Sequence, residues 1–421
     1  MMGFFKKIFK EKEPVEEVQE YRQYMIVCPH CFRKFAPDDV VFRLTHHTDD
    51  EKYCLQEDLL LNDYLEKFGL EASDELEAVI TPNDVPEASR IYADGVLIGL
   101  RDKYGVETRK RLCPFCHNDL PFLAGKTPSN IIAIIGDSQV GKSVYMSALI
   151  RTLEAQTAHE FNAACLPSNN ETSIRFNKQY INPLFYNNTL IESTQKERKQ
   201  EPFIYDFKFK DQSKTPLSLV FFDVAGEGMT DNRYLELYAN HIKNATGILF
   251  LVDPLEFPIL KDKIVKRYKD LKNVDGMIRE PRDVIVSLSE NFISAESGER
   301  TNIPTAIVLT KSDMLLELDE AEIESINVDS RIFSNYIHKG YFDLGEYRRV
   351  EKEVVDLFNE VSQSFIDAVE VHFSNTGFFA VSALGQNPVE GKLEGVIQPT
   401  RVDEPFLWLL YKLGYISGGE S

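Results

Sequence analysis

One short motif constrains the fold of this chain more than any other feature of its sequence. Residues 136–143 read GDSQVGKS and match the pattern GxxxxGK[ST]. An apolar run at 131–135 ends directly before the motif, and a helical pattern starts at Lys142. Glycines in such a loop let the backbone wrap closely around phosphate groups and point its N–H groups inward. The sequence therefore predicts a phosphate-binding loop between a strand and a helix.

Each position of this loop has an expected role at a bound nucleotide. The helix N-terminus adds a favourable dipole, Lys142 is expected to reach the β and γ phosphates, and Ser143 is expected to ligate Mg²⁺. A chance glycine-rich turn is the alternative, and the strand and helix in register with the motif argue against it. The predicted phosphate contacts are Gly136, Asp137, Ser138, Gln139, Val140, Gly141, Lys142 and Ser143.

After residue 127 the chain alternates apolar strands with amphipathic helices. Continuous apolar strands in such an alternation predict an α/β fold, with a mainly parallel sheet covered on both faces and one adjacent antiparallel hairpin. The predicted strands are 131–135, 203–209, 217–222, 247–252, 305–309 and 377–381. The predicted helices are 142 to about 156, 174–185, 234–243, a stretch ending near 373, and 405–413.

Three further motifs follow the apolar strands. The strand at 217–222 leads into DVAG, a DxxG pattern in which Asp223 can hold Mg²⁺ through water and the Gly226 N–H can sense a γ-phosphate. The strand at 305–309 leads into TKSD, which resembles the [NT]KxD element of Ras-like and translation-factor-like GTPases. The last strand leads into Ser382-Ala383-Leu384, which resembles the SA[KL] element that closes over guanine.

With all four motifs in the expected order, residues 128 to 417 resemble the TRAFAC class of P-loop GTPases. Within that class the DVAGEG and LVDP strings and the cysteine pairs make the chain similar to bacterial double-GTPase families of conflict and anti-phage loci. The resemblance implies a Ras-like fold, GTP or GDP as ligand, Mg²⁺ as cofactor, and a role in a bacterial defence or conflict system. It also implies that Thr310 and Lys311 line the base and that Asp313 accepts hydrogen bonds from guanine N1–H and its exocyclic amine, a pair of donors that adenine lacks.

Hydrolysis is expected to be slow or aided by a partner. Ras-like proteins carry a glutamine after DxxG, whereas this chain carries Glu227. A carboxylate can accept a hydrogen bond from water but cannot donate one to phosphate, and its charge opposes that of the substrate. The candidate catalytic residues are Lys142, Glu227 and a switch I threonine that would also bind Mg²⁺.

Three threonines qualify for switch I: Thr172, Thr189 and Thr194. Thr194 is favoured, because it lies shortly before the strand at 203–209 and after the helical stretch that precedes it. Basic side chains close behind it fit an internal arginine finger or, as the favoured interpretation, a solvated loop. These side chains are Lys196, Arg198 and Lys199.

Two CxxC pairs indicate a structural metal. Cys28, Cys31, Cys113 and Cys116 can supply a tetrahedral Cys₄ set for Zn²⁺, which leaves no position open for water. The distance in sequence between the pairs exceeds that of an ordinary zinc ribbon, so an insertion must separate them. Free thiols or redox disulfides are the alternative, and His30 and His117 are alternative ligands. Cys54 and Cys165 have no paired spacing and are expected to be buried apolar residues.

The chain of 421 residues is long enough for two or three domains. We expect an amphipathic segment and tether at 1–20, a small α+β zinc-ribbon-like domain with an insertion at 21–126, and the GTPase domain at 127–421. Residues 1–12 place apolar and basic side chains on different sides of a helix, which fits contact with an anionic membrane and equally fits a frayed terminus or a docking peptide.

The net charge of −20 argues against nucleic acid as a partner. No run is apolar and long enough to span a membrane, and no signal peptide begins the chain, so a cytoplasmic location is expected, with peripheral attachment at the inner membrane face as an option. The favoured function is a GTP-hydrolysing switch that meets a protein partner through its zinc module or switch loops. A nucleotide-binding scaffold with little or no turnover is the alternative, and an ATPase is a third.

Overall fold

The computed structural model describes residues 23–67, 70–137, 140–191, 202–211, 214, 217–223, 240–267, 279–290, 300–318, 322–388 and 392–420, with the backbone alone at 218, 222 and 223. Among them, no helix combines the length and the apolar character needed to cross a membrane.

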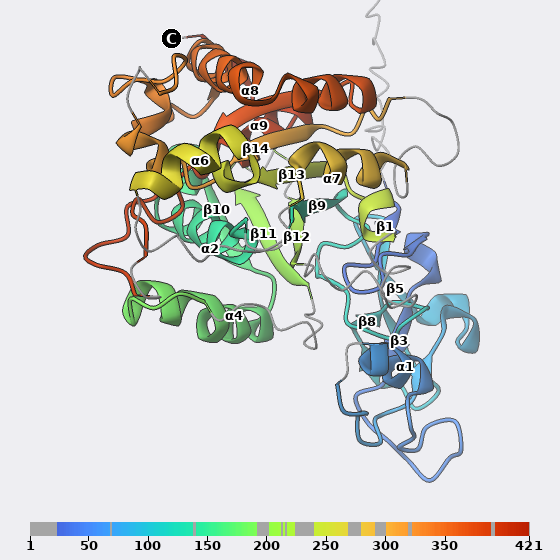
Figure 1. Cartoon of the computed structure of the whole chain (residues 1–421). Helices are drawn as coiled ribbons and strands as arrows, with labels where there is room; N and C mark the ends of the chain where they lie inside the picture. Colours follow the sequence, from blue (N-terminus) through green and yellow to red (C-terminus); the bar gives the residue numbers. More distant parts are fainter. Residues whose placement is uncertain are drawn as a thin grey trace, which may run out of the picture.

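A seven-stranded sheet in the order β10-β11-β12-β9-β13-β14-β16 forms the centre of the larger part of the molecule (Figure 1). Five strands, from β12 to β16 in this order, run parallel, and β10 and β11 pair antiparallel at one edge. The strands are β9 (Ser129–Ile135), β10 (Ala163–Pro167), β11 (Phe203–Phe209), β12 (Leu217–Asp223), β13 (Gly247–Val252), β14 (Thr305–Leu309) and β16 (Thr376–Ala380). The predicted α/β class is confirmed, and β10 is an edge strand that was not predicted.

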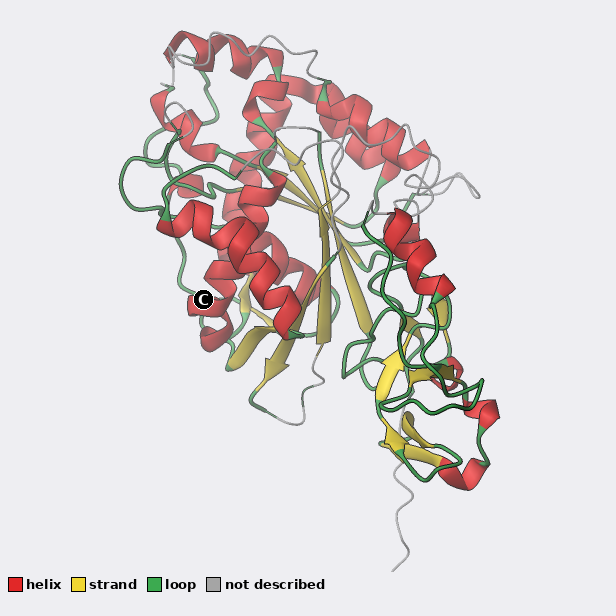
Figure 2. Ribbon diagram, turned by 90° about the horizontal axis from the view of Figure 1, so that it is seen from below, coloured by secondary structure: helices red, strands yellow, loops and turns green. Residues whose placement is uncertain are grey.

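Helices cover both faces of this sheet (Figure 2). The α-helices are α2 (Lys142–Thr152), α3 (Ala158–Glu160), α4 (Asn170–Phe176), α6 (Pro258–Arg267), α7 (Pro281–Leu288), α8 (Leu344–His372) and α9 (Glu404–Lys412). Two π-helical stretches, η4 (Leu153–Thr157) and η5 (Asn177–Tyr186), continue α2 and α4. The helix predicted for 142–156 therefore changes from α-helix to π-helix after Thr152. Short 3-10 helices are η1 (Pro37–Asp39), η2 (Pro82–Asp84), η3 (Glu87–Ser89), η6 (Pro254–Glu256), η9 (Ser312–Glu317) and η10 (Arg331–Phe333).

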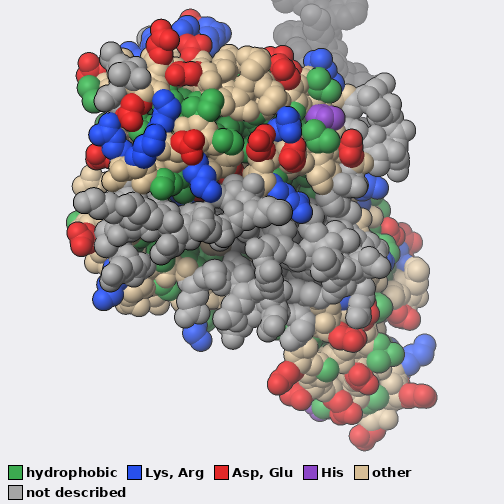
Figure 3. Space-filling model, in the orientation of Figure 1, with side chains coloured by type: hydrophobic (Ala, Val, Ile, Leu, Met, Phe, Trp, Pro, Cys, Tyr) green, Lys and Arg blue, Asp and Glu red, His purple; other side chains and the backbone are tan. Residues whose placement is uncertain are grey.

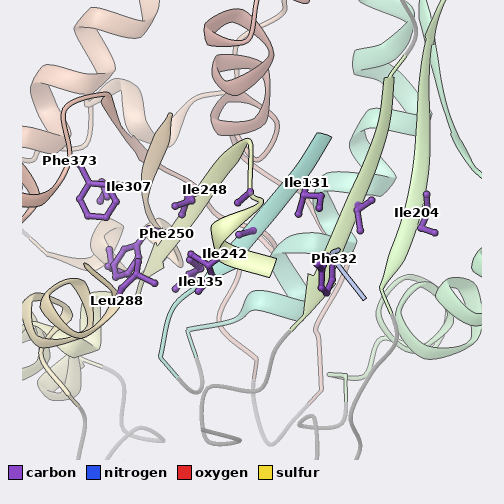
Figure 4. Close-up of a cluster of buried hydrophobic side chains, with 14 of the residues drawn as sticks. Phe32, Ile131, Ile135, Ile204, Ile242, Ile248, Phe250, Leu288, Ile307 and Phe373 are labelled. Atoms are coloured by element: carbon purple, nitrogen blue, oxygen red, sulfur yellow. The ribbon is translucent and has the colours of Figure 1, made fainter. Parts of the chain in front are cut away.

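The inner strands β9, β13 and β14 are almost wholly apolar because both of their faces are buried. In β9, Ile131 and Ile135 enter a core that includes side chains of α6, α7 and α8, whereas Ile132 and Ile134 enter a second core with α2 and α9. Figure 4 shows part of the first core, in which Ile248 and Phe250 of β13 lie near Leu288 of α7. Continuous apolar runs are the expected signature of strands covered in this way.

The N-terminal part contains short antiparallel strands and lies at one end of the molecule (blue in Figure 1). Its strands form three small sheets: β1 (Ile26–Val27) with β2 (Lys34–Phe35); β3 (Val41–Arg43) with β4 (Val79–Ile80) and β8 (Lys110–Leu112); and β5 (Arg90–Ala93) with β6 (Val96–Arg101) and β7 (Glu107–Thr108). The helix α1 (Leu59–Lys67) lies in the insertion. A further pair, β15 (Phe342–Asp343) with β17 (Gly418–Gly419), joins α8 to the end of the chain. The domain boundaries proposed from the sequence stay predictions.

The N-terminal part packs against the central sheet through the loop that carries Cys28 and Cys31. The Phe32 ring is fully buried and lies 4.7 Å from the His241 ring, centroid to centroid. The Asn244 side-chain amide donates a 3.1 Å hydrogen bond to the Phe32 carbonyl. Phe32 thereby joins the core that contains Ile131 and Ile242 (Figure 4).

Candidate functional site

The loop at 136–143 connects β9 to α2, as the motif predicts. Any side chain at Gly136 would collide with its surroundings, because a Cβ there would stand 2.6 Å from the Leu251 carbonyl oxygen and 2.8 Å from Val140 Cγ2. Gly141 has φ +86, in the left-handed region that glycine adopts without strain. The two glycines are therefore required by this backbone path. Ser138 and Gln139 lie outside the described residues.

The Lys142 ammonium is held inside the loop. Its Nζ donates to the carbonyl oxygens of Gly136 at 3.1 Å and Asp137 at 2.9 Å, and the residue is 9% exposed. Lys142 and Ser143 begin α2, whose first N–H groups and dipole favour an anion at this end. The loop thus gathers a lysine ammonium and a helix N-terminus in the arrangement that suits a phosphate chain.

The TKSD segment after β14 contacts the phosphate loop directly. The Thr310 hydroxyl lies 3.0 Å from the carbonyl oxygens of both Val140 and Val252. Lys311 has φ +51, in the left-handed region. Its side chain passes close to Gly141: if Gly141 carried a Cβ atom, that atom would lie 3.9 Å from Lys311 Cε. The phosphate loop and the TKSD segment therefore form one surface.

The third and fourth motifs also meet. The Ser382 hydroxyl donates to Asp313 Oδ1 at 2.5 Å and accepts from the Gly385 N–H at 2.8 Å. Burial raises the pKa of Asp313, and the hydrogen bond from Ser382 opposes this shift. The carboxyl group of Asp313 is thus oriented by the SAL segment, which is the arrangement expected if both line one base pocket.

A second chain segment supports the SAL segment from behind. Ser382 exchanges backbone hydrogen bonds with Thr400 at 3.0 and 2.7 Å, and the Gln398 N–H donates to the Leu384 carbonyl at 3.2 Å. Arg401, which is 3% exposed, follows and donates to Glu346 at 2.7 Å and to Glu404 at 2.5 Å. These contacts place Ser382, Ala383 and Leu384 on an anchored turn.

Two acidic residues of the site were missed in the sequence analysis. Asp253 Oδ2 accepts a hydrogen bond from the Lys311 ammonium, and Glu256 Oε2 accepts from the Asp253 N–H at 2.8 Å. Burial, reinforced by the charges of Asp253 and Asp137, raises the pKa of Glu256 to about 8. The LVDP string held a usable signal, because Asp253 directly follows an apolar strand and the carboxyl ends of parallel strands meet at one edge.

The remaining predicted residues are placed only in part. The backbone of Asp223 ends β12 and pairs with Ile134 of β9, next to the start of the phosphate loop. Gly226, Glu227 and Thr194 lie outside the described residues. Of the alternatives to Thr194, Thr172 is buried in α4, and the Thr189 hydroxyl donates to the Pro183 carbonyl at 3.2 Å. The choice among the three threonines stays a prediction.

Comparison with known families decides the class of this protein. The sequence profile described as Double-GTPase 2 matches residues 130–363, more than half of the chain. The chain belongs to the Double-GTPase 2 family. All described strands of its central sheet from β10 to β14 fall within the matched residues.

The curated protein SaeC of Mycolicibacterium smegmatis, named as a candidate ESX-1 scaffolding and assembly protein, is 26% identical to this Double-GTPase 2 protein over 324 residues. The match covers 72% of this chain and 80% of SaeC. Two solved structures match more loosely. The GTP-bound Ski7 GTPase-like domain of S. cerevisiae has a TM-score of 0.29 and 12% identity, covering 68% of this chain and 51% of that one. The bacterial selenocysteine-specific elongation factor EF-Sec has a TM-score of 0.25 and 14% identity, covering 61% and 26%.

The four paired cysteines of this Double-GTPase 2 protein form one cluster. Their sulfur atoms all lie within 4.8 Å of one another, with 3.7 Å between Cys28 and Cys116 and 3.7 Å between Cys31 and Cys113. A tetrahedral zinc site with bonds of about 2.3 Å separates its sulfur atoms by about 3.8 Å, whereas a disulfide separates them by about 2 Å. The cluster therefore has the spacing of a metal site and not of disulfides.

The two neighbouring histidines have other partners. His30 Nδ1 lies 3.4 Å from the Tyr64 hydroxyl of α1, and His117 Nδ1 lies 2.8 Å from an Asp58 carboxylate oxygen. Both rings thus connect the cysteine loops to the insertion, and the four sulfur atoms suffice for a closed site. Cys165 is buried as expected, whereas Cys54 is partly exposed and its thiol faces the Glu51 carbonyl at 3.3 Å, so the predicted burial of Cys54 was wrong. Neither thiol belongs to the four-cysteine cluster, as expected.

Proposed function

We propose that this Double-GTPase 2 protein is a magnesium-dependent molecular switch that binds GTP and hydrolyses it slowly. The observation that carries the proposal is the contact between motifs far apart in sequence: Lys142 is enclosed by the phosphate loop, Lys311 crosses that loop, and Asp313 meets Ser382. A triphosphate and a purine could be bound together only if these motifs share one pocket.

Different groups of residues would bind the phosphates, the Mg²⁺ ion and the base. The phosphates would bind at 136–143, with Lys142 on the β and γ groups, and Mg²⁺ would be held by Ser143, by Asp223 through water and by Thr194. When bound, Mg²⁺ supplies positive charge that neutralises the phosphate oxygens. Thr310, Lys311, Asp313 and the SAL segment at 382–384 would surround guanine, whose N1–H and amine suit the Asp313 carboxylate.

Slow turnover follows from the chemistry of one position. Glu227 directly follows the DxxG motif, where Ras-like proteins carry a water-positioning glutamine, and a negative charge next to the γ-phosphate would disfavour the reaction. A partner that supplies a positive charge would accelerate hydrolysis. A scaffold with little or no turnover is the second candidate, and the name of the relative SaeC, which refers to scaffolding and assembly, favours it.

Zinc in the Cys₄ cluster would shape a module for protein contacts. The loop of Cys28 and Cys31 packs through Phe32 on His241 and Asn244, which end the segment following DxxG. A change in that segment on hydrolysis could therefore reach the zinc module by direct contact. Acidic side chains predominate over the N-terminal part on the face drawn in Figure 3, which accords with a protein partner and not with nucleic acid. Cytoplasmic location, a role in bacterial defence and membrane contact by residues 1–12 are further proposals.

Binding and phosphate release should be measured on the wild type, Lys142→Ala and Asp313→Ala. We expect the wild type to prefer GTP and GDP over ATP, Lys142→Ala to bind no nucleotide, and Asp313→Ala to lose the preference for guanine. Steady phosphate release with GTP and Mg²⁺ supports the switch. Tight binding without release would favour the scaffold, and equal binding of ATP by the wild type would exclude the assignment of Asp313.

A further inference from the structure

The Lys311 side chain is fixed at both of its ends. At one end the backbone adopts the left-handed conformation with φ +51. At the other end the ammonium pairs with the Asp253 carboxylate, whose side chain is 7% exposed while that of Lys311 is 36% exposed. Between these two points the alkyl chain passes over Gly141. A lysine in solution samples many rotamers, and this one is restricted to the edge of the phosphate loop.

Asp253 is itself held by its own short helix. Its Oδ1 accepts from the Leu255 N–H at 2.9 Å, and its backbone N–H donates to Glu256 Oε2 at 2.8 Å, so the two residues form a capping box at the start of η6. One carboxylate oxygen therefore orients Asp253, and the other is directed at Lys311. An ordinary exposed ion pair does not require its carboxylate to be oriented by backbone hydrogen bonds in this way.

We propose that Asp253 is a positioning residue for nucleotide binding, which holds the Lys311 ammonium so that the lysine chain lies along the purine and ribose, with Glu256 keeping Asp253 in that orientation. This inference rests on the proposed guanine-nucleotide site. Asp253 does not contact the base; it acts through Lys311. Loss of the Asp253 contact removes one of the interactions that hold the long lysine side chain, so nucleotide binding would have to supply more of its ordering.

Two physical effects of removing the Asp253 charge can be told apart. Loss of positioning weakens all guanine nucleotides alike, because Lys311 meets the base and ribose. Loss of a negative charge near the phosphates instead strengthens binding, and more so for GTP than for GDP, because GTP carries more charge. An equal loss of affinity for GDP and GTP would therefore show that Asp253 acts by positioning Lys311.

The test is a double-mutant cycle with GDP and GTP affinities for the wild type, Asp253→Asn, Lys311→Met and the double variant. Asn keeps an oxygen for the Leu255 N–H, so η6 should persist. We expect Asp253→Asn to weaken both nucleotides by about 10-fold, the size of one partly exposed charged hydrogen bond, and to add less than about 2-fold in the Lys311→Met background.

Asp102→Asn is a matched control. Asp102 Oδ1 accepts from the N–H groups of Tyr104 at 2.8 Å and Val106 at 3.0 Å, and its Oδ2 faces His46, but it lies in the N-terminal part. This variant should bind both nucleotides as the wild type does. Unchanged affinity in Asp253→Asn, or losses that add up in the double variant, would overturn the inference while the proposed function stands. A wild type that binds neither GDP nor GTP would overturn the proposed function itself.

Discussion

Single side chains in this protein act through partners distant in sequence. Lys311 lies over Gly141 and pairs with Asp253, and Thr310 lies 3.0 Å from the carbonyls of Val140 and Val252. Thr310 and Lys311 follow β14, and these contacts join them to the residues that follow the neighbouring strand β13 and to the loop that follows β9. The candidate nucleotide site is therefore as rigid as the edge of the sheet on which it stands.

Glu256 gives this site a testable dependence on pH. Its pKa is raised to about 8, so the carboxyl group is neutral below that pH and becomes charged above it. The charged groups facing it are Asp253, Asp137 of the phosphate loop and Lys311. Ionisation adds a negative charge near Asp137 of the loop that we propose to bind the phosphates, and so we expect GDP affinity to fall as the pH rises through about 8.

The variant Glu256→Gln isolates this effect, because glutamine resembles the neutral acid. GDP affinity, measured from pH 6.5 to 9.5 on the full chain, should stay flat in the variant over the range in which the wild type weakens by about 5- to 10-fold. At pH 7 the two proteins should bind alike. The same decline in both proteins would assign the pH dependence to another group.

At the scale of elements, the central sheet is held between two cores. Phe250 of β13 is 1% exposed and lies in the core that contains Leu288 of α7 (Figure 4). Replacing it by alanine leaves a cavity between a strand and a helix layer, and such cavities typically cost about 3 to 5 kcal/mol. We expect Phe250→Ala to lower the free energy of unfolding by that amount.

Urea unfolding followed by the fluorescence of Trp408 measures this change. Trp408 is the one tryptophan of the chain and is 2% exposed in α9, so its emission reports on the sheet. Leu166→Ala in β10 is a suitable control, because Leu166 is 51% exposed and should change stability by less than about 0.5 kcal/mol. Equal losses in the two variants would contradict the burial argument.

In the whole molecule, a small part that carries the four-cysteine cluster packs against a large part built on the central sheet. The N-terminal strands have two to six residues each, which is too little sheet to be stable alone. We therefore expect a metal to be needed there and one equivalent of zinc per chain. Removing it with a chelator should make residues 23–126 sensitive to protease while GDP binding persists, because every proposed nucleotide contact follows residue 127.

Metal analysis, limited proteolysis and GDP titration on the full chain check this prediction together. Cys113→Ser should reproduce the effect of the chelator, and Cys54→Ser, outside the cluster, should leave zinc content unchanged. Loss of GDP binding together with zinc would mean that the zinc module completes the nucleotide site.

Features that depend on local geometry and short-range pattern could be predicted from the residues alone. The phosphate loop was predictable because only glycine fits at Gly136 and Gly141, the strands because burial on both faces demands unbroken apolar runs, and the cysteine cluster because each CxxC turn directs two thiols at one point. The edge strand β10 escaped prediction, since its residues AACLP lack the β-branched pattern of a strand.

The contacts between distant side chains could not be predicted from the sequence. Asp253 with Lys311, Asp58 with His117, and Phe32 with His241 are pairs separated by long stretches of chain. Their partnership depends on strand order and on the packing of one part against the other, and no local pattern encodes either. The physical reason is that a motif specifies the shape of its own backbone, whereas a contact between distant motifs is specified by the whole core that brings them together.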